Sequence, residues 1–114
     1  MLSTGIDIIE IERIKKTINR YGNKFLNRIY SEKEIDYCHS KSNPYPSYAV
    51  RFAAKEAYIK YNEGLNGLNF KDIEIRNNQN GKPLLYIKGK KKKCSISLSH
   101  SRKNAVAVVI GGKN

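Results

Sequence analysis

The chain has 114 residues, of which 39% are hydrophobic and 10% aromatic, so one small folded domain is expected rather than a disordered chain. Its 22 basic and 10 acidic residues give a net charge of +12, which favours a polyanionic partner such as nucleic acid, anionic lipid, a phosphorylated ligand or an acidic protein. Cys38 and Cys94 are far apart and lack the spacing of metal ligands, which fits free thiols in a reducing compartment. No apolar run suits a signal peptide or a membrane span, so a soluble, cytoplasmic protein is expected.

The first segment, residues 6–11, alternates and is rich in β-branched side chains, which predicts a short strand. Asp7 is unusual there, because aspartate is depleted in strand interiors; an edge strand or a turn at Gly5 would explain it without any function. From Glu10 the apolar spacing becomes helical, and Gly22 is the expected end of that helix.

The polar side of this helix is basic, and the basic series continues beyond the glycine. Such a stripe is most often a solvated face. Few acids interrupt this one, so it is a candidate docking surface. Its members are Arg13, Lys16, Arg20, Lys24 and Arg28.

A short helix is predicted around residues 25–30, and Ser31 with Glu34 forms a capping-box pattern that starts another helix, ending near Cys38. Residues 39–46 are rich in turn formers and predict a loop. A long central helix is then expected, with Ser47 as its N-cap and Gly64 as its stop.

The central helix contains small residues around a carboxylate. Ala53, Ala54 and Ala57 allow other backbone to come close, and Glu56 among them must be paired, hydrated or bound to a metal. Lys60 lies one turn later, so the simplest alternative is a surface Glu–Lys pair.

The C-terminal half predicts antiparallel strands. Residues 72–76 and 84–88 flank an Asn-Gly turn and form a hairpin, whereas the basic segment 89–93 is expected to be a solvated loop tip. Residues 94–99 alternate, and 105–110 form an apolar central strand. The predicted class is α+β, a single domain (1–114) with an antiparallel sheet packed on a long central helix plus short helices.

Four stretches together resemble one family, holo-acyl-carrier-protein synthase, the small type of 4′-phosphopantetheinyl transferase. They are Gly5-Ile6-Asp7-Ile8-Ile9-Glu10-Ile11-Glu12-Arg13-Ile14, the run from Arg51 to Lys60, the hairpin of residues 72–83, and Ser97-Leu98-Ser99-His100-Ser101. The resemblance spans nearly the whole chain in order. It implies transfer of the phosphopantetheine arm of coenzyme A to a serine of apo acyl carrier protein, releasing adenosine 3′,5′-bisphosphate, in fatty acid or lipid biosynthesis.

The resemblance also implies a Mg²⁺ ion bound by Asp7 and Glu56, with Lys60 near the reacting phosphate. Either carboxylate is a candidate base, directly or through a metal-bound water. Residues that match nucleotide- or phosphate-binding positions are Arg51, His100 and Ser101, and Gly64 in a loop that otherwise departs from the family pattern. Residues that match the docking surface for the acidic carrier protein are Arg13 first, then Arg20, Lys24 and Arg28.

The family works as a homotrimer with active sites between subunits, so a homotrimer is expected here, in the cytoplasm or, after removal of a transit peptide, in an organelle. One rival is a nucleic-acid-binding module that uses the lysine-rich tip and the tyrosines, but the tyrosines do not cluster on one predicted sheet face. A second rival binds coenzyme A or carrier protein without transfer. The intact Asp7, Glu56 and Lys60 argue against it. The large positive charge would steer an acidic carrier protein and a polyphosphate substrate, so no nucleic-acid or membrane partner is expected.

Overall fold

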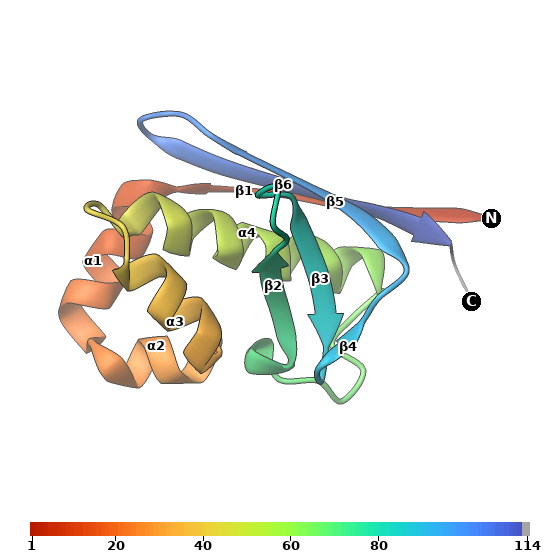
Figure 1. Ribbon diagram of the computed structural model, residues 1–114, viewed down its shortest axis with the longest axis horizontal. Coiled ribbons are helices and arrows are strands. Elements are labelled where there is room, and N and C mark those ends of the chain that lie inside the picture. The colour runs from red at the N-terminus through yellow and green to blue at the C-terminus, as the bar shows by residue number, and fades with distance from the viewer. Residues whose placement is uncertain (113–114) are drawn as a thin grey trace.

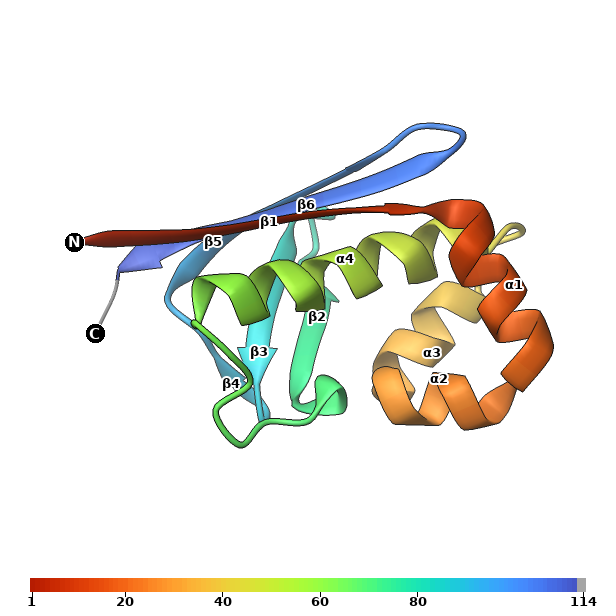
Figure 2. The same cartoon turned by 180° about the vertical axis from the view of Figure 1, so that it is seen from behind.

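Two three-stranded antiparallel sheets and one long helix organise the computed structural model, which describes residues 1–112 (Figures 1 and 2). The strand orders are β1-β6-β5 and β2-β3-β4. The elements are β1 (Leu2–Glu10), α1 (Ile11–Tyr21), α2 (Asn23–Ile29), α3 (Glu32–His39), α4 (Tyr45–Tyr61), the 3-10 helix η1 (Phe70–Asp72), β2 (Ile73–Asn77), β3 (Pro83–Ile87), β4 (Lys90–Lys91), β5 (Cys94–His100) and β6 (Asn104–Gly112). The predicted α+β class is confirmed, with two sheets in place of one.

The first sheet carries β6 at its centre, as predicted, and β1 at one edge. In its register Asp7 pairs with Ala107, and Ala107 pairs with Leu98 on β5. Alternation along β1 turns Gly5, Asp7 and Ile9 toward α4 and leaves the side chains of residues 6 and 8 on the opposite face. Asp7 is therefore an edge-strand residue that faces the central helix.

The contact between β1 and α4 requires a glycine. A Cβ atom at Gly5 would lie 1.9 Å from the Ala57 carbonyl oxygen and 2.7 Å from the Tyr61 nitrogen. The Ser3 hydroxyl donates a hydrogen bond of 2.9 Å to the Tyr61 carbonyl oxygen, which fixes the same approach. The small helix residues therefore do let the first strand come close, as the sequence predicts.

Gly5→Ala is expected to lower the free energy of unfolding by about 3 kcal/mol or more, because the added methyl group meets helix backbone that cannot move aside. Chemical denaturation measures this. Gly112→Ala is the matched control, since nothing lies within 4 Å of a Cβ built there. Equal stability of both variants would contradict the close approach of β1 to α4.

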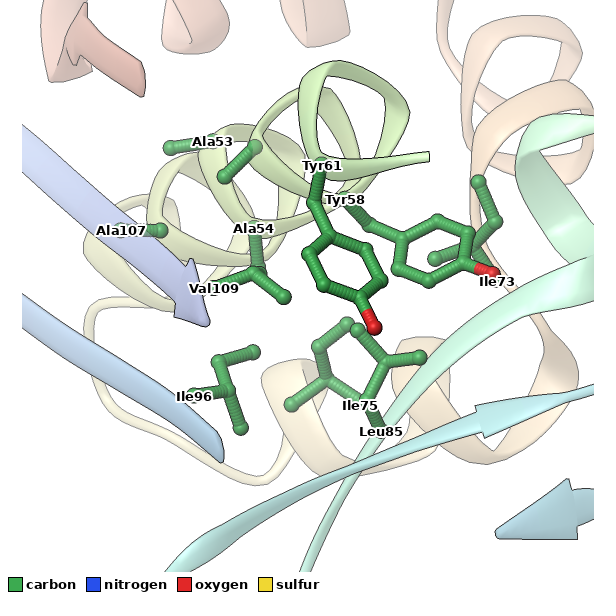
Figure 3. Close-up of a cluster of buried hydrophobic side chains, with 11 residues drawn as sticks. Ala53, Ala54, Tyr58, Tyr61, Ile73, Ile75, Leu85, Ile96, Ala107 and Val109 are labelled. Atoms are coloured by element: carbon green, nitrogen blue, oxygen red, sulfur yellow. The ribbon is translucent and has the colours of Figure 1, made fainter. Parts of the chain in front are cut away.

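The hydrophobic core has two parts, which meet along α4. One lies between α4 and the two sheets, and Figure 3 shows Tyr58, Tyr61, Ile75 and Leu85 gathered there. The other packs α1, α2 and α3 on the N-terminal half of α4, around Tyr30 and Tyr48. Both parts of the core therefore pack against α4.

Several helix boundaries differ from the prediction. Helix α4 begins at Tyr45 rather than after Ser47, because Pro46 fits the first turn, where no backbone N–H is needed. The capping box of α3 is confirmed, with the Glu34 amide donating to the Ser31 hydroxyl at 3.2 Å. In residues 1–112, no helix combines the length and apolar character that a membrane crossing requires.

A buried ion pair links α3 to α4, and the sequence did not reveal it. The Lys55 ammonium donates to Glu34 Oε1 at 2.8 Å, and both side chains are fully buried. It also donates to the carbonyl oxygens of Phe70, at 3.0 Å, and Ile73. The other Glu34 oxygen accepts the Ile75 amide at 3.1 Å, so this pair joins α3, α4 and β2.

Candidate active site

A cavity of about 420 Å³ opens between β1, α1, α2 and α4. Its charged lining is Asp7 from β1, Arg13 from α1 and Glu56 from α4. Apolar side chains make up much of the remaining wall. The lining as a whole comprises Asp7, Ile8, Ile9, Arg13, Ile14, Thr17, Phe25, Phe52 and Glu56.

Lys60 reaches the same strand from one turn further along α4. Its ammonium donates to the Ile6 carbonyl oxygen at 2.8 Å and to Asp7 Oδ1 at 3.3 Å. The Asp7 side chain is 18% exposed and that of Lys60 is 55% exposed. The ion pair anticipated for Lys60 is therefore made with Asp7, and its exposed ammonium is free to turn toward a phosphate.

Burial raises the pKa of Glu56 above its usual value, and the nearby Asp7 charge raises it further, while Lys60 lowers it. Two carboxylates that repel each other in a half-buried cavity are stabilised by a cation between them. Asp7 and Glu56, which are far apart in the sequence, line the same cavity, and their role as metal ligands stays a prediction.

The Asp7 and Glu56 carboxylates suit a magnesium ion that takes some of its oxygen ligands from the protein and the others from substrate and water. Mg²⁺ takes oxygen ligands in octahedral geometry and commonly keeps waters and substrate phosphates beside one or two carboxylates. Asp7 and Glu56 supply two carboxylates at a cavity with room for a ligand. Among residues 1–112, no group of three or more His, Cys, Asp and Glu side chains gathers as a complete protein-only site would require.

The cavity adjoins a second hollow at α1 and α2. This second hollow of about 320 Å³ is lined by Thr17, Tyr21, Lys24, Phe25 and Arg28, and it shares Thr17 and Phe25 with the first. Arg13 lines the first hollow, and Lys24 and Arg28 line the second; these two adjoining hollows are called the groove below. Arg20 lies outside it, with its guanidinium 5.3 Å from the Tyr21 ring centroid.

Arg51 is not part of this cavity. Its guanidinium donates to Asn77 Oδ1 at 2.6 Å and lies 4.3 Å from the centroid of the Tyr37 ring. The residue is buried on the side of α4 that faces β2, and its Nε atom has no hydrogen-bond partner among the described residues. Within one subunit, Arg51 is separated from Asp7 and Glu56 by the helix itself.

His100 and Ser101 lie at the β5–β6 turn, across β6 from β1. The register places His100 opposite Ala105 and Ala105 opposite Ile9, so His100 lies two strands from the β1 site. The Ser101 hydroxyl accepts the amides of Lys103 and Asn104 at 3.3 and 3.2 Å, which is a turn-stabilising role. Within one subunit, neither His100 nor Ser101 is among the residues that line the cavity at Asp7 and Glu56, although Lys103 of the same turn accepts a hydrogen bond of 2.8 Å from the Ile11 amide.

Gly64 follows the end of α4. Its φ of 128° is a conformation open to glycine, and its amide donates to the Ile59 carbonyl oxygen at 2.9 Å. The glycine stops the helix region as predicted, although α4 itself ends three residues earlier, at Tyr61.

Phe25 and Phe52 line the cavity, although neither was among the site residues predicted from the sequence. Their rings stack with centroids 6.4 Å apart beside Asp7 and Glu56. Phe52 lies one helical turn before Glu56, which is the one signal that could have found it. Nothing in the sequence pairs Phe25 with this face, since α2 and α4 meet only through tertiary packing.

Comparisons with known proteins identify the family to which the chain belongs. The family model for the 4′-phosphopantetheinyl transferase superfamily matches residues 3–110. The chain therefore belongs to the 4′-phosphopantetheinyl transferase superfamily, and it is an enzyme of that class. More particularly, its curated relatives are holo-[acyl-carrier-protein] synthases, which confirms the family resemblance noted in the sequence.

Among these relatives, the protein from Thermodesulfovibrio yellowstonii is 49% identical over 106 residues, covering 93% of this chain and 94% of the relative. That from Halothermothrix orenii is 44% identical over 117 residues, covering 94% of each. A solved structure of a holo-(acyl-carrier-protein) synthase from Bacillus anthracis, in complex with CoA (3′,5′-ADP), has a TM-score of 0.81 at 38% identity and covers 95% of this chain and 93% of that one. The Helicobacter pylori synthase in complex with coenzyme A has a TM-score of 0.82 at 38% identity, covering 93% and 96%.

Proposed function

We propose that this protein transfers the 4′-phosphopantetheine arm of coenzyme A to a serine of apo acyl carrier protein, in a Mg²⁺-dependent reaction that serves fatty acid or lipid biosynthesis. The observation that carries the proposal is the joint lining of one cavity by Asp7 and Glu56, with Lys60 on Asp7 and a basic groove leading away. The synthases from Bacillus anthracis and Helicobacter pylori, solved with coenzyme A or its 3′,5′-ADP portion, support the choice of co-substrate.

The reaction forms a bond from the serine oxygen to the phosphorus that carries the pantetheine arm and breaks that phosphorus's bond to the bridging oxygen. Adenosine 3′,5′-bisphosphate leaves, and Asp7 or Glu56 accepts the serine proton, directly or through water. A magnesium ion held by the same two carboxylates would supply positive charge to the pyrophosphate. Lys60 adds a point charge beside it, and Phe25 and Phe52 form an apolar wall next to the reacting groups.

A homotrimer with active sites between subunits is part of the proposal, because one subunit leaves its first sheet uncovered. On the face turned away from α4, Leu2, Ile6, Ile8 and Ile110 are 70%, 59%, 66% and 42% exposed. A neighbouring subunit on this face would bury them and could bring Arg51, Gly64 or the His100–Ser101 turn to the cavity of another subunit. Sedimentation equilibrium should give three times the 13.0 kDa chain mass.

Arg13→Glu should raise the Michaelis constant for carrier protein by about tenfold, because the acidic partner meets a reversed charge at the groove. The Michaelis constant for coenzyme A should change less than about twofold. Steady-state kinetics with each substrate varied in turn measures this. Lys41→Glu reverses an exposed lysine outside the groove and should change neither constant. Equal effects of Arg13→Glu on both constants would contradict a docking role.

The transfer itself is tested by incubating the protein with coenzyme A, Mg²⁺ and apo carrier protein and weighing the carrier by mass spectrometry. The expected result is the added mass of the phosphopantetheine arm. An unmodified carrier, together with tight and salt-dependent RNA binding, would instead support the nucleic-acid-binding alternative.

A further inference from the structure

The lysine segment, defined as Lys88 and Lys90–Lys93, is exposed except for half-buried Lys92, as expected of a solvated tip, but Lys90 and Lys91 form a strand of the second sheet where the sequence predicts a loop. Lys91 pairs with Tyr86 in the β3–β4 ladder, and Lys90 pairs with Ile87. The Lys92 amide donates to the Leu85 carbonyl oxygen at 2.8 Å, just before the chain crosses to β5. Hydrogen bonds therefore fix the backbone positions from which the side chains of Lys90, Lys91 and Lys92 extend.

Three of the lysines line a cavity. Lys91, Lys92 and Lys93, with Tyr61 and Gly112, surround a hollow of about 480 Å³. A neighbouring hollow of about 230 Å³ shares Tyr61, Lys92 and Gly112, and its other lining residues are Ser3, Asn62, Glu63 and Asn66. Lys92, which is half-buried, is therefore the cation common to both hollows.

The charge of this recess is strongly positive. Three ion pairs among residues 1–112, Lys55–Glu34, Lys60–Asp7 and Arg76–Glu74, involve no residue of the lysine segment. Among the lining residues of the two hollows, Glu63 supplies one carboxylate against three ammonium groups. Three cations held together raise the local potential and favour an anion with several charges.

The recess is separate from the candidate active site. The two hollows share no lining residue with the cavity at Asp7 and Glu56. Figure 1 shows β4 near the C-terminal end of α4 and α1 at the other end of the molecule. A ligand here would therefore occupy a second site on the same subunit.

We propose that this recess binds a compact polyphosphorylated anion, a di- or triphosphate that is free or part of a nucleotide. A volume of about 480 Å³ lies within the range of small-molecule sites, which is roughly 300–1,000 Å³. Lysine ammonium groups suit phosphate as point charges without a fixed geometry. The concave shape and the second hollow beside Lys92 favour a compact ligand over a flat membrane or a duplex.

Titration of the full chain with inorganic pyrophosphate tests the proposal, at fixed ionic strength and without divalent cations. Calorimetry gives the affinity, and NMR shifts of the Asn62, Asn66, Lys92 and Gly112 amides report this recess rather than the active site. Lys91→Gln/Lys92→Gln/Lys93→Gln should weaken the affinity at this recess by about tenfold or more. The matched control Lys15→Gln/Lys16→Gln/Lys41→Gln removes three exposed lysines elsewhere and should stay within about twofold of the unaltered protein.

Unchanged pyrophosphate affinity in the first triple variant would overturn the proposal, as would shifts confined to the surroundings of Asp7 and Glu56. Equal affinity for sulfate would exclude a preference for polyphosphate. Binding of an RNA duplex or anionic vesicles, without binding of pyrophosphate, would show a macromolecular partner instead. If the triple variant fails to fold, Lys92→Gln alone should weaken binding about threefold, and no change would count equally against the site. Failure here leaves the transferase assay unaffected.

Discussion

Glu56→Gln is expected to lower the rate of phosphopantetheine transfer by about 10³-fold with the fold intact, because it removes one of the two carboxylates that line the reacting cavity. The amide keeps the size of the side chain, so the packing of Phe52 beside it is preserved. Transfer kinetics at saturating Mg²⁺ measure the loss, and circular dichroism checks the fold.

Glu32→Gln is the matched control for this experiment, since it makes the same chemical change at an exposed residue on α3. It should transfer at the rate of the unaltered protein. Normal transfer by Glu56→Gln in excess Mg²⁺ would remove both the metal-binding and the base role from this residue.

The same variant carries a stability test whose sign follows from the raised pKa of Glu56. Burial and the Asp7 charge make the ionised form of Glu56 unfavourable in the folded protein. The contribution of Glu56 to the stability is therefore largest when its carboxyl group is protonated, and it is lost as the pH rises through the folded-state pKa. Glutamine resembles the protonated form. Without divalent cations at neutral pH, Glu56→Gln should melt no lower than the unaltered protein, whereas added Mg²⁺ should raise the melting temperature of the unaltered protein only. A lower melting temperature in the cation-free variant would contradict this account.

Lys55→Met is expected to have the largest effect on stability, lowering the free energy of unfolding by about 3–5 kcal/mol. The substitution fills similar volume but leaves the Glu34 carboxylate buried without its cation. It also removes the donor to the carbonyl oxygens of Phe70 and Ile73, which hold η1 and the start of β2. Denaturant titration at a fixed protein concentration measures the change.

The control for the buried pair is Lys33→Met, which removes an exposed lysine from α3 and should change the stability by less than about 0.5 kcal/mol. Adding Glu34→Gln to Lys55→Met should recover part of the loss, because the neutral amide no longer buries a charge while its oxygen can still accept a hydrogen bond. No recovery in the double variant would show that packing around Lys55, rather than charge, sets the cost.

Local sequence patterns were reliable where the backbone alone decides the structure. The capping box at Ser31 and Glu34, the glycine that ends α1, and the Asn-Gly hairpin depend on residues a few positions apart, and all three are present. The start of α4 was misplaced, because the proline that was expected to end a loop fits the first turn of a helix.

Charged residues were harder to place, because their environment is set by elements distant in the sequence. Lys55 sits next to Glu56 in the chain, yet helical geometry turns one into the core and the other into the active-site cavity. The basic segment 89–93 is largely exposed, as predicted for a solvated tip, but Lys90 and Lys91 form a two-residue strand on β3 where a loop was predicted. Neither outcome could be found without knowing which surfaces pack together.

The sequence by itself determined the class of the fold and the family, because these are carried by contiguous motifs and residue types. Asp7 and Glu56 as metal ligands follow from the family resemblance and stay a prediction. Only the tertiary structure decided that Phe25 walls the cavity, that Arg51 lies on the other side of α4, and that Lys91–Lys93 surround a recess. The physical reason is that motifs depend on local backbone geometry, whereas burial and the sharing of a cavity depend on which faces of β1, α2, α4 and β4 meet.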